Sequence, residues 1–221
     1  MNVFDKNWKE PLVQEKNPVG TRRQQQKAET KASILAAARV LFEELGFEAA
    51  TMRAVAAKAE VGLGTIFAHF PDKGALLIAA LLEDLAQTDQ KILETLPADV
   101  PIKAQIMHLA EAGFGYWCRR PTLSATLLRE MWFIQGEWAE RRREETARFI
   151  EFVFELLEGA RRRGEIREDA DLRYTAEALY SFYVGILVRA AGDGRLDLDV
   201  LLKDTGVYVD QLMAGLGDRL T

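Results

Sequence analysis

The stretch from Thr51 to Lys73, TMRAVAAKAEVGLGTIFAHFPDK, constrains the fold of this chain more than any other segment. Thr51 suits the N-cap of a short helix, because its hydroxyl can accept a hydrogen bond from an amide of the first turn. Gly62 then marks a tight turn. Ile66 and Phe70, four residues apart, give the segment after the turn one apolar face. The proline that follows ends this second helix, since the residue before a proline is disfavoured in the helical region.

Two short helices joined by a turn of a few residues form a helix-turn-helix unit. The small side chain of Ala56 allows the two helices to cross closely. In DNA-binding proteins of this kind the second helix lies in the major groove. The same arrangement also occurs as a plain corner between helices, so the pattern alone leaves both interpretations open.

The remainder of the chain is helical in pattern, and we find no convincing strand. Apolar residues recur at helical spacing, and glycines and prolines separate the segments. We therefore predict an all-α fold of about nine helices. Besides the two short helices, the expected segments cover about 28–45, 73–96, 137–163 and 199–216, with further helices beginning after Pro101, at Pro121 and at Asp169 or Asp171.

Charge is distributed unevenly along the chain. Residues 21–73 carry eight Lys or Arg and six Asp or Glu, a net charge of +2. Residues 74–221 carry 18 and 25, a net charge of −7. A slightly basic segment on an acidic chain is consistent with a local DNA-facing surface, although a solvated surface has the same appearance.

Patterns of catalytic and metal-binding residues are not evident. His69 and His108 lie in different predicted domains, and Cys118 is the single cysteine, so a zinc site is not expected. The chain has no Walker loop and no nucleophile elbow. It also has no signal-peptide core and no apolar run of membrane-spanning length. We expect a cytoplasmic protein that is not an enzyme, needs no cofactor and does not bind a membrane.

Residues 31–77 resemble the DNA-binding domain of the TetR (tetracycline-repressor) family of transcription regulators. The resemblance rests on the IL-x-AA-x-x-LF-x-x-x-GF run at 34–47, on the V-x-x-GTIF-x-HF run at 61–70 and on Lys73 just beyond it. The sequence departs from the usual family pattern at three positions: Glu60 replaces Gly, Gly62 replaces Ser or Thr, and Phe67 replaces Tyr. Glu60 is thereby expected in a left-handed turn position, and Gly62 removes a side-chain cap.

The resemblance implies an N-terminal arm at 1–27, a helix-turn-helix domain at 28–75 and a larger helical domain for effector binding and dimerisation at 76–221. It also implies a repressor that a small hydrophobic or aromatic effector releases from a pseudo-palindromic operator on double-stranded DNA. An activator or a regulator controlled by a protein partner, on the same fold, is one alternative. An all-helical enzyme or carrier is another.

The resemblance also suggests which residues contact DNA. In the family's manner, the residues of the second short helix that face bases are Leu63, Gly64, Thr65 and Ala68. The residues at family positions that touch phosphates are Thr51, His69 and Lys73. Arg22 and Arg23 lie in the arm and can follow a minor groove, although a solvated tail is an equal possibility. The candidate DNA-binding residues are Arg22, Arg23, Thr51, Leu63, Gly64, Thr65, Phe67, Ala68, His69 and Lys73.

Aromatic residues are concentrated in the central helices of the larger domain. Each of them is accounted for by an ordinary core, but together they can line the effector pocket that TetR-like regulators place in this domain. The candidate pocket residues are Phe114, Trp117, Arg129, Trp132, Phe133, Trp138 and Phe149.

The helix that ends near residue 191 is apolar on more than one face. One stripe, with Leu179 and Ile186, suits the core of its own subunit, and the second stripe needs another partner. We expect a homodimer built from the last two helices of each chain, as the resemblance also implies. The candidate interface residues are Ala178, Phe182, Gly185, Val207, Tyr208 and Leu212.

Overall fold

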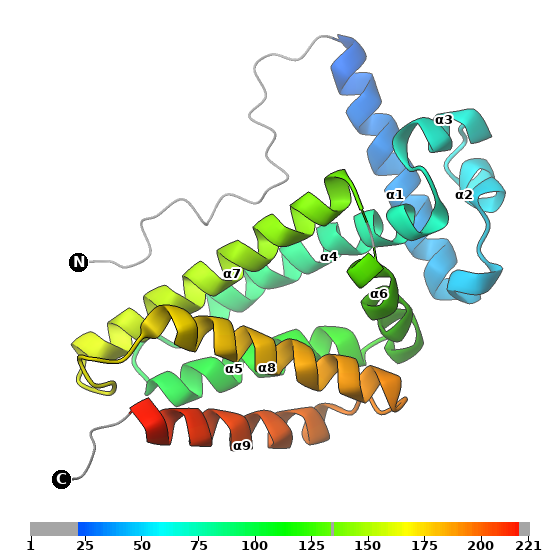
Figure 1. Ribbon diagram of the computed structural model, residues 1–221. Helices are drawn as coiled ribbons and strands as arrows, with labels where there is room; N and C mark the ends of the chain where they lie inside the picture. The colour runs from blue at the N-terminus through cyan, green and yellow to red at the C-terminus, as the bar shows by residue number, and fades with distance from the viewer. Residues whose placement is uncertain (1–21, 134, 217–221) are drawn as a thin grey trace. The chain divides into compact units, whose positions relative to one another are not determined.

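The computed structural model describes residues 22–133 and 135–216, except for the side chains of residues 83, 84, 86, 87, 89–91, 93, 132, 133 and 137. Every regular element in this part of the chain is a helix, which confirms the predicted all-α class (Figure 1). The helices are α1 Arg22–Ala49, α2 Met52–Lys58, α3 Leu63–His69, α4 Lys73–Thr95, α5 Ile102–Cys118, α6 Pro121–Phe133, α7 Glu137–Arg162, α8 Leu172–Gly192 and α9 Leu198–Leu216.

The first helix begins at Arg22, six residues before the expected start at residue 28. Arg22 and Arg23 therefore lie on the first turn of α1 and not in an extended arm. The reason is local, because the segment RRQQQK consists of good helix formers and contains no Gly or Pro. Residues 1–21, the remainder of the expected arm, lie outside the described residues. Near its other end α1 bends at Gly46, whose φ of 77° suits a residue without a Cβ.

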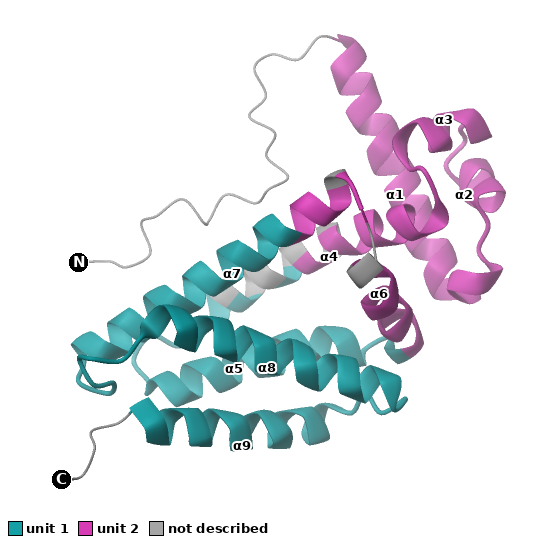
Figure 2. Cartoon of the chain, viewed as in Figure 1, with its two compact units in different colours: residues 1–9, 88–121, 143–221 teal, residues 10–87, 122–142 magenta. Residues whose placement is uncertain are grey.

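The described residues form two compact units (Figure 2). We call residues 22–87, 122–133 and 135–142 the head unit, and residues 88–121 and 143–216 the body unit. The helix-turn-helix is in the head unit, as expected. That unit also contains most of α6 and the first residues of α7, which the sequence had assigned to the larger domain. The predicted functional boundaries at 27/28 and 75/76 therefore differ from the boundaries of compact packing.

The head unit is held together by a small apolar core from α1, α2 and α3. Ile34 and Leu35 of α1, Ile66 of α3 and Phe70, which follows α3, have no exposed surface. Val55 of α2 is 1% exposed. Burial of a side chain of this size stabilises a fold by about 1.5–3 kcal/mol. The position of the exposed face of α3 is therefore fixed by the buried face opposite to it.

In the body unit, α9 packs against both α5 and α8. Its core includes Ile102, Ile106, Leu109, Phe152, Leu157, Ala176, Leu179 and Val209. The N-terminus of α5 follows Pro101, which offers no side-chain cap. Glu165, from the loop after α7, caps it instead, because its carboxylate accepts a hydrogen bond of 2.7 Å from the amide of Ile102.

None of the described helices is long and apolar enough by itself to span a membrane. One pair, Leu63–His69 with Lys73–Leu82, meets the length and composition requirement only when taken together across a bend of 66°.

Candidate functional site

The turn of the helix-turn-helix has the geometry that its sequence indicates. The Thr51 hydroxyl accepts a hydrogen bond of 3.1 Å from the amide of Ala54, which confirms its role as the N-cap of α2. Glu60 has a φ of 55°, the left-handed conformation expected of a residue that replaces a glycine. That conformation costs a residue with a Cβ roughly 1–2 kcal/mol. Gly62 precedes α3 without a side-chain cap, also as expected.

Helix α3 presents an exposed face opposite Ile66. Gly64, Thr65 and Ala68 are exposed on this face, and the side chain of Phe67 is 50% exposed. The two ends of the helix, Leu63 and His69, are half-buried. All the α3 residues predicted to approach DNA thus have surface available for contact. Thr65 supplies a hydroxyl on this face, and the other side chains are apolar or absent.

Two cations of α1 lie near the end of α3. The pKa of His69 is lowered from its ordinary value, mainly by burial and further by the positive charges of Lys27 and Lys31. Both effects favour the neutral form of the His69 ring in the free protein. Neither lysine was among the predicted DNA-binding residues. Their four-residue spacing, which puts them on one face of a helix, was the available signal, but the expected helix began only at residue 28.

Lys73 has a structural role in the head unit. Its Nζ donates hydrogen bonds to the carbonyl oxygens of Phe47 at 2.7 Å and Glu48 at 3.2 Å, in the last turn of α1. It also lies 4.3 Å from the centre of the Phe47 ring. These bonds satisfy carbonyls that have no partner within the helix. They use two of the three ammonium hydrogens, so the predicted phosphate contact remains chemically compatible with this geometry.

Trp138, predicted to line an effector pocket, belongs instead to the head unit. Its side chain is 6% exposed, and its ring stacks on Phe70 with the centroids 6.0 Å apart. Lys31 lies 5.2 Å from the centre of the indole ring, and Arg141 lies 5.6 Å from it. The first turn of α7 is thereby packed against the residue that ends the helix-turn-helix.

The other candidate pocket residues do not form a single described cluster. In the body unit, Phe114 stacks on Tyr183 with the centroids 4.8 Å apart, and the Trp117 indole nitrogen donates a hydrogen bond of 2.8 Å to the Tyr183 hydroxyl. Phe149 lies beside Tyr180 in the same unit, with ring centroids 6.0 Å apart. Arg129 is in the head unit, where it donates to Thr126 at 3.4 Å. The side chains of Trp132 and Phe133 lie outside the described part of the structure.

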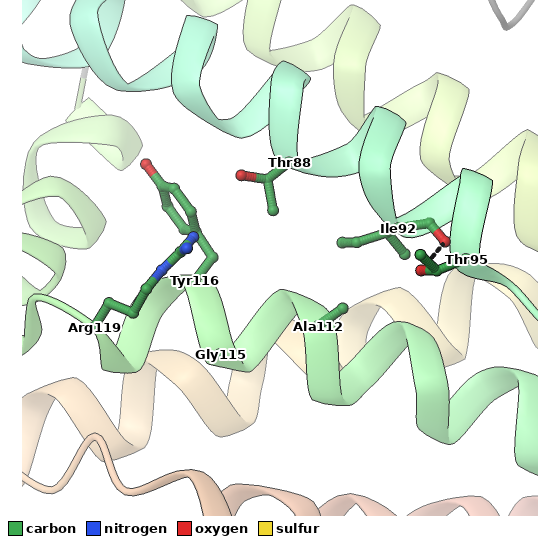
Figure 3. A pocket seen from close by; sticks show the side chains of 7 residues that line it. All are labelled: Thr88, Ile92, Thr95, Ala112, Gly115, Tyr116 and Arg119. Carbon is green, nitrogen blue, oxygen red and sulfur yellow. Dashed lines mark hydrogen bonds between the residues drawn. The ribbon is translucent and has the colours of Figure 1, made fainter.

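A cavity of about 390 Å³ is present in the body unit, between α4 and α5 (Figure 3). It is lined by Thr88, Ile92, Thr95, Ala112, Gly115, Tyr116 and Arg119. None of these residues was among the candidates. Tyr116 is the one aromatic side chain among them, and the rest give no aromatic signal in the sequence.

The second face of α8 is exposed in the described chain, together with part of α9. Leu179 and Ile186 are buried in the body unit, as the two-stripe pattern predicted. Phe182 stacks on Tyr208 with ring centroids 5.0 Å apart, and Val207 is 57% exposed. The other candidate interface positions are also accessible to different degrees: Gly185 is exposed, and Ala178 and Leu212 are half-buried.

Comparison with known proteins assigns the fold and the head unit. A family described as "Bacterial regulatory proteins, tetR family" matches residues 34–80, which cover α2, α3 and the turn between them. The HTH-type transcriptional regulator UidR of Escherichia coli K12 is 27% identical over 162 residues, covering 72% of this chain and 80% of that protein. The helix-turn-helix segment of this chain is therefore that of the TetR family.

Two further proteins are similar to this chain. The HTH-type transcriptional repressor KstR of Mycobacterium tuberculosis is 40% identical over 63 residues, covering 28% of this chain and 29% of that protein. FadR of Thermus thermophilus, a repressor whose structure was solved with lauroyl-CoA, has a TM-score of 0.69 at 24% identity, covering 86% of this chain and 97% of that chain. This likeness shows that the fold is shared. The matches confirm the expected resemblance to the TetR family and the expected DNA-binding function. The proteins that match are transcription regulators.

Proposed function

We propose that this chain is a ligand-responsive repressor, active as a homodimer in the cytoplasm, that binds a pseudo-palindromic operator with α3 in the major groove. The observation that carries the proposal is the geometry of α3. Ile66 and Phe70 fix its inner face, while Thr65, Phe67 and Ala68 face outward. One relative, 40% identical over 63 residues, is itself named as a repressor.

Direct readout of bases depends mainly on Thr65 and on shape. The outer face of α3 has no Arg, Lys, Asn or Gln for a bidentate contact with a base edge. The Thr65 hydroxyl can bond to a base edge, and Phe67 and Ala68 are suited to contact thymine methyl groups. We therefore expect operators with thymines at the positions that α3 reaches.

Phosphate contacts supply most of the affinity in this proposal. Lys27 and Lys31 of α1 lie near His69 at the end of α3. Arg22 and Arg23 precede them on the same helix, and Lys73 begins α4. The whole chain has a net charge of −5, so attraction to DNA has to come from this local group. The Thr51 hydroxyl, which caps α2, lies at an exposed helix start and is a further candidate for a phosphate contact.

The exposed apolar face of α8 and α9 supports the homodimer. Tyr208 is 37% exposed and Val188 is 43% exposed, in addition to Val207. An added Cβ on Gly185 meets no atom within 4 Å, so a second helix has room to approach there. A symmetric pair of these faces forms an isologous interface, in which each residue contributes twice.

Selection of binding sequences from a random duplex pool tests the proposal. We expect wild-type protein to enrich a pseudo-palindrome whose half-sites are about 10 base pairs apart or a multiple of that spacing. Thr65→Ala should relax selection at particular positions, whereas Glu168→Ala, a change at an exposed residue of the loop between α7 and α8, should leave the enriched sequence unchanged. Recovery of no common sequence by the wild type would contradict the proposal.

A further inference from the structure

We propose that the cavity between α4 and α5 is the effector site and that it binds a medium-chain carboxylate, with the acid group on Arg119 and the chain along the apolar wall. This inference rests on the proposed function, since it names the ligand class and the place where the ligand acts. The cavity belongs entirely to the body unit, and its lining residues come from two helices that face each other (Figure 3).

The size of the cavity limits the ligand. Its volume of about 390 Å³ lies within the range of small-molecule sites. At about 30 Å³ for each water-sized group, this space holds roughly a dozen non-hydrogen atoms. Decanoate, with ten carbons and two oxygens, has that number.

Arg119 supplies the positive charge at one end of the cavity. Its guanidinium carbon lies 5.4 Å from the centre of the Tyr116 ring, so the cation is held against an aromatic face. Several other arginines of the body unit form ion pairs within the chain, as Arg173 does with Glu151 at 2.7 Å. Among the residues whose side chains the structure describes, Arg119 forms no ion pair. A planar guanidinium matches a carboxylate better than any other side chain does.

The remaining walls select an apolar body for the ligand. Ile92 and Tyr116 are nearly buried, and Ala112 and Gly115 on α5 are too small to fill the space in front of them. At the end formed by Thr95, the hydroxyl is already bonded to the carbonyl of Ile92 at 3.1 Å and to His108 Nε2 at 3.1 Å. The polar end of the ligand is therefore directed to Arg119 and not to this end.

Helix α4 gives the site a route to DNA binding. It begins at Lys73, whose Nζ holds the last turn of α1, and its residues Thr88, Ile92 and Thr95 line the cavity. A ligand that binds better to one position of α4 than to another shifts the population of the head's conformations in proportion to that preference.

The test compares decanoate with decanol, both below their micelle concentrations, in wild type and in two arginine variants. Isothermal titration calorimetry measures binding, and fluorescence anisotropy measures release of the selected operator. We expect decanoate to bind wild type and release DNA, and Arg119→Gln to weaken decanoate binding by about 10- to 100-fold. Arg120→Gln, a change at the exposed neighbour of Arg119, should bind decanoate as wild type does. Decanol should bind weakly to all three proteins.

A further variant tests the location of the site without changing any charge. Ala112→Phe should fill the cavity and abolish decanoate binding while leaving operator affinity unchanged. Equal decanoate binding by wild type, Arg119→Gln and Ala112→Phe would overturn the site, and equal binding of decanol and decanoate would overturn the ligand class. In both cases operator binding by wild type would leave the proposed function intact, whereas failure to bind any selected operator would refute the proposed function itself.

Discussion

Removal of the Trp138 side chain should disconnect the start of α7 from the end of the helix-turn-helix. The indole is 6% exposed and stacks on Phe70, with Lys31 5.2 Å and Arg141 5.6 Å from the ring centre. Truncation of a buried tryptophan to alanine costs about 3–5 kcal/mol. That is a large part of the roughly 5–15 kcal/mol by which a domain is stable. The two cation–π contacts account for about 0.5–1 kcal/mol each of that loss.

Urea unfolding followed by circular dichroism measures the loss in the free energy of unfolding. Operator affinity is measured without urea, under conditions in which the variant is folded. We expect Trp138→Ala to lower the free energy of unfolding by about 3–5 kcal/mol and to weaken operator binding, because Phe70 ends the segment that α3 belongs to. Trp138→Phe retains a ring on Phe70 and should lose less of both. Glu168→Ala, at an exposed residue of the loop between α7 and α8, serves as the control and should change stability by less than about 0.5 kcal/mol. A Trp138→Ala protein with wild-type stability and wild-type operator affinity would refute the reasoning.

Four further predictions follow from single contacts. Tyr183→Phe leaves the indole N–H of Trp117 without its 2.8 Å acceptor and should cost about 1–3 kcal/mol in urea unfolding; a loss near zero would mean that another acceptor replaces it. Lys73→Met should lower the free energy of unfolding, because two carbonyls of α1 lose their charged donor. It should also reduce the salt dependence of DNA binding by about one phosphate contact. An unchanged salt dependence would show that Lys73 does not contact DNA. Phe182→Glu should give monomers in sedimentation velocity and weaken operator binding, since it buries two unpaired charges at a symmetric interface; a folded dimer would place the interface elsewhere. The pKa of His69 is lowered in the free protein, so its contribution to stability is present above the unfolded pKa of about 6.5 and is lost as the pH falls below that value. Operator affinity should rise over the same pH range, because a phosphate contact favours the charged ring. A His69→Gln variant with the same pH profiles of stability and affinity would contradict this assignment.

The helix-turn-helix could be predicted from the sequence because its signals are local. Thr51, Glu60 and Gly62 each act on the backbone within a few residues, and the structure gives each the conformation that was expected. The start of α1 could not be predicted in the same way. Gly20 lies two residues before Arg22. The basic segment from Arg22 to residue 28 has a composition that suits an arm as well as a helix.

The candidate effector pocket could not be predicted because aromatic residues indicate burial but not what they are buried against. Phe114 and Trp117 pack on Tyr183, and Trp138 packs on Phe70 in the other unit. A cavity is formed where side chains are absent, and small residues such as Ala112 carry no such signal in a sequence.

The two faces of α8 were predictable for a different reason. A helix with two apolar stripes has more apolar surface than one core can cover. The pattern identified the stripe that belongs to the core, and Ile186 on that stripe is 2% exposed. Phe182 lies on the other stripe. The partner of that second stripe is a property of the assembly and not of one chain.

The central claim is that α3 and its surrounding cations recognise a specific DNA sequence. The most direct measurement is the affinity of wild-type protein for the selected operator and for a scrambled duplex of the same composition, by fluorescence anisotropy over a range of KCl concentrations. The account predicts affinity for the operator at least about 10³-fold above that for the scrambled duplex at physiological salt, and a steep loss of both affinities as salt rises. Equal affinity for the two duplexes, or an operator affinity that does not depend on salt, would contradict it.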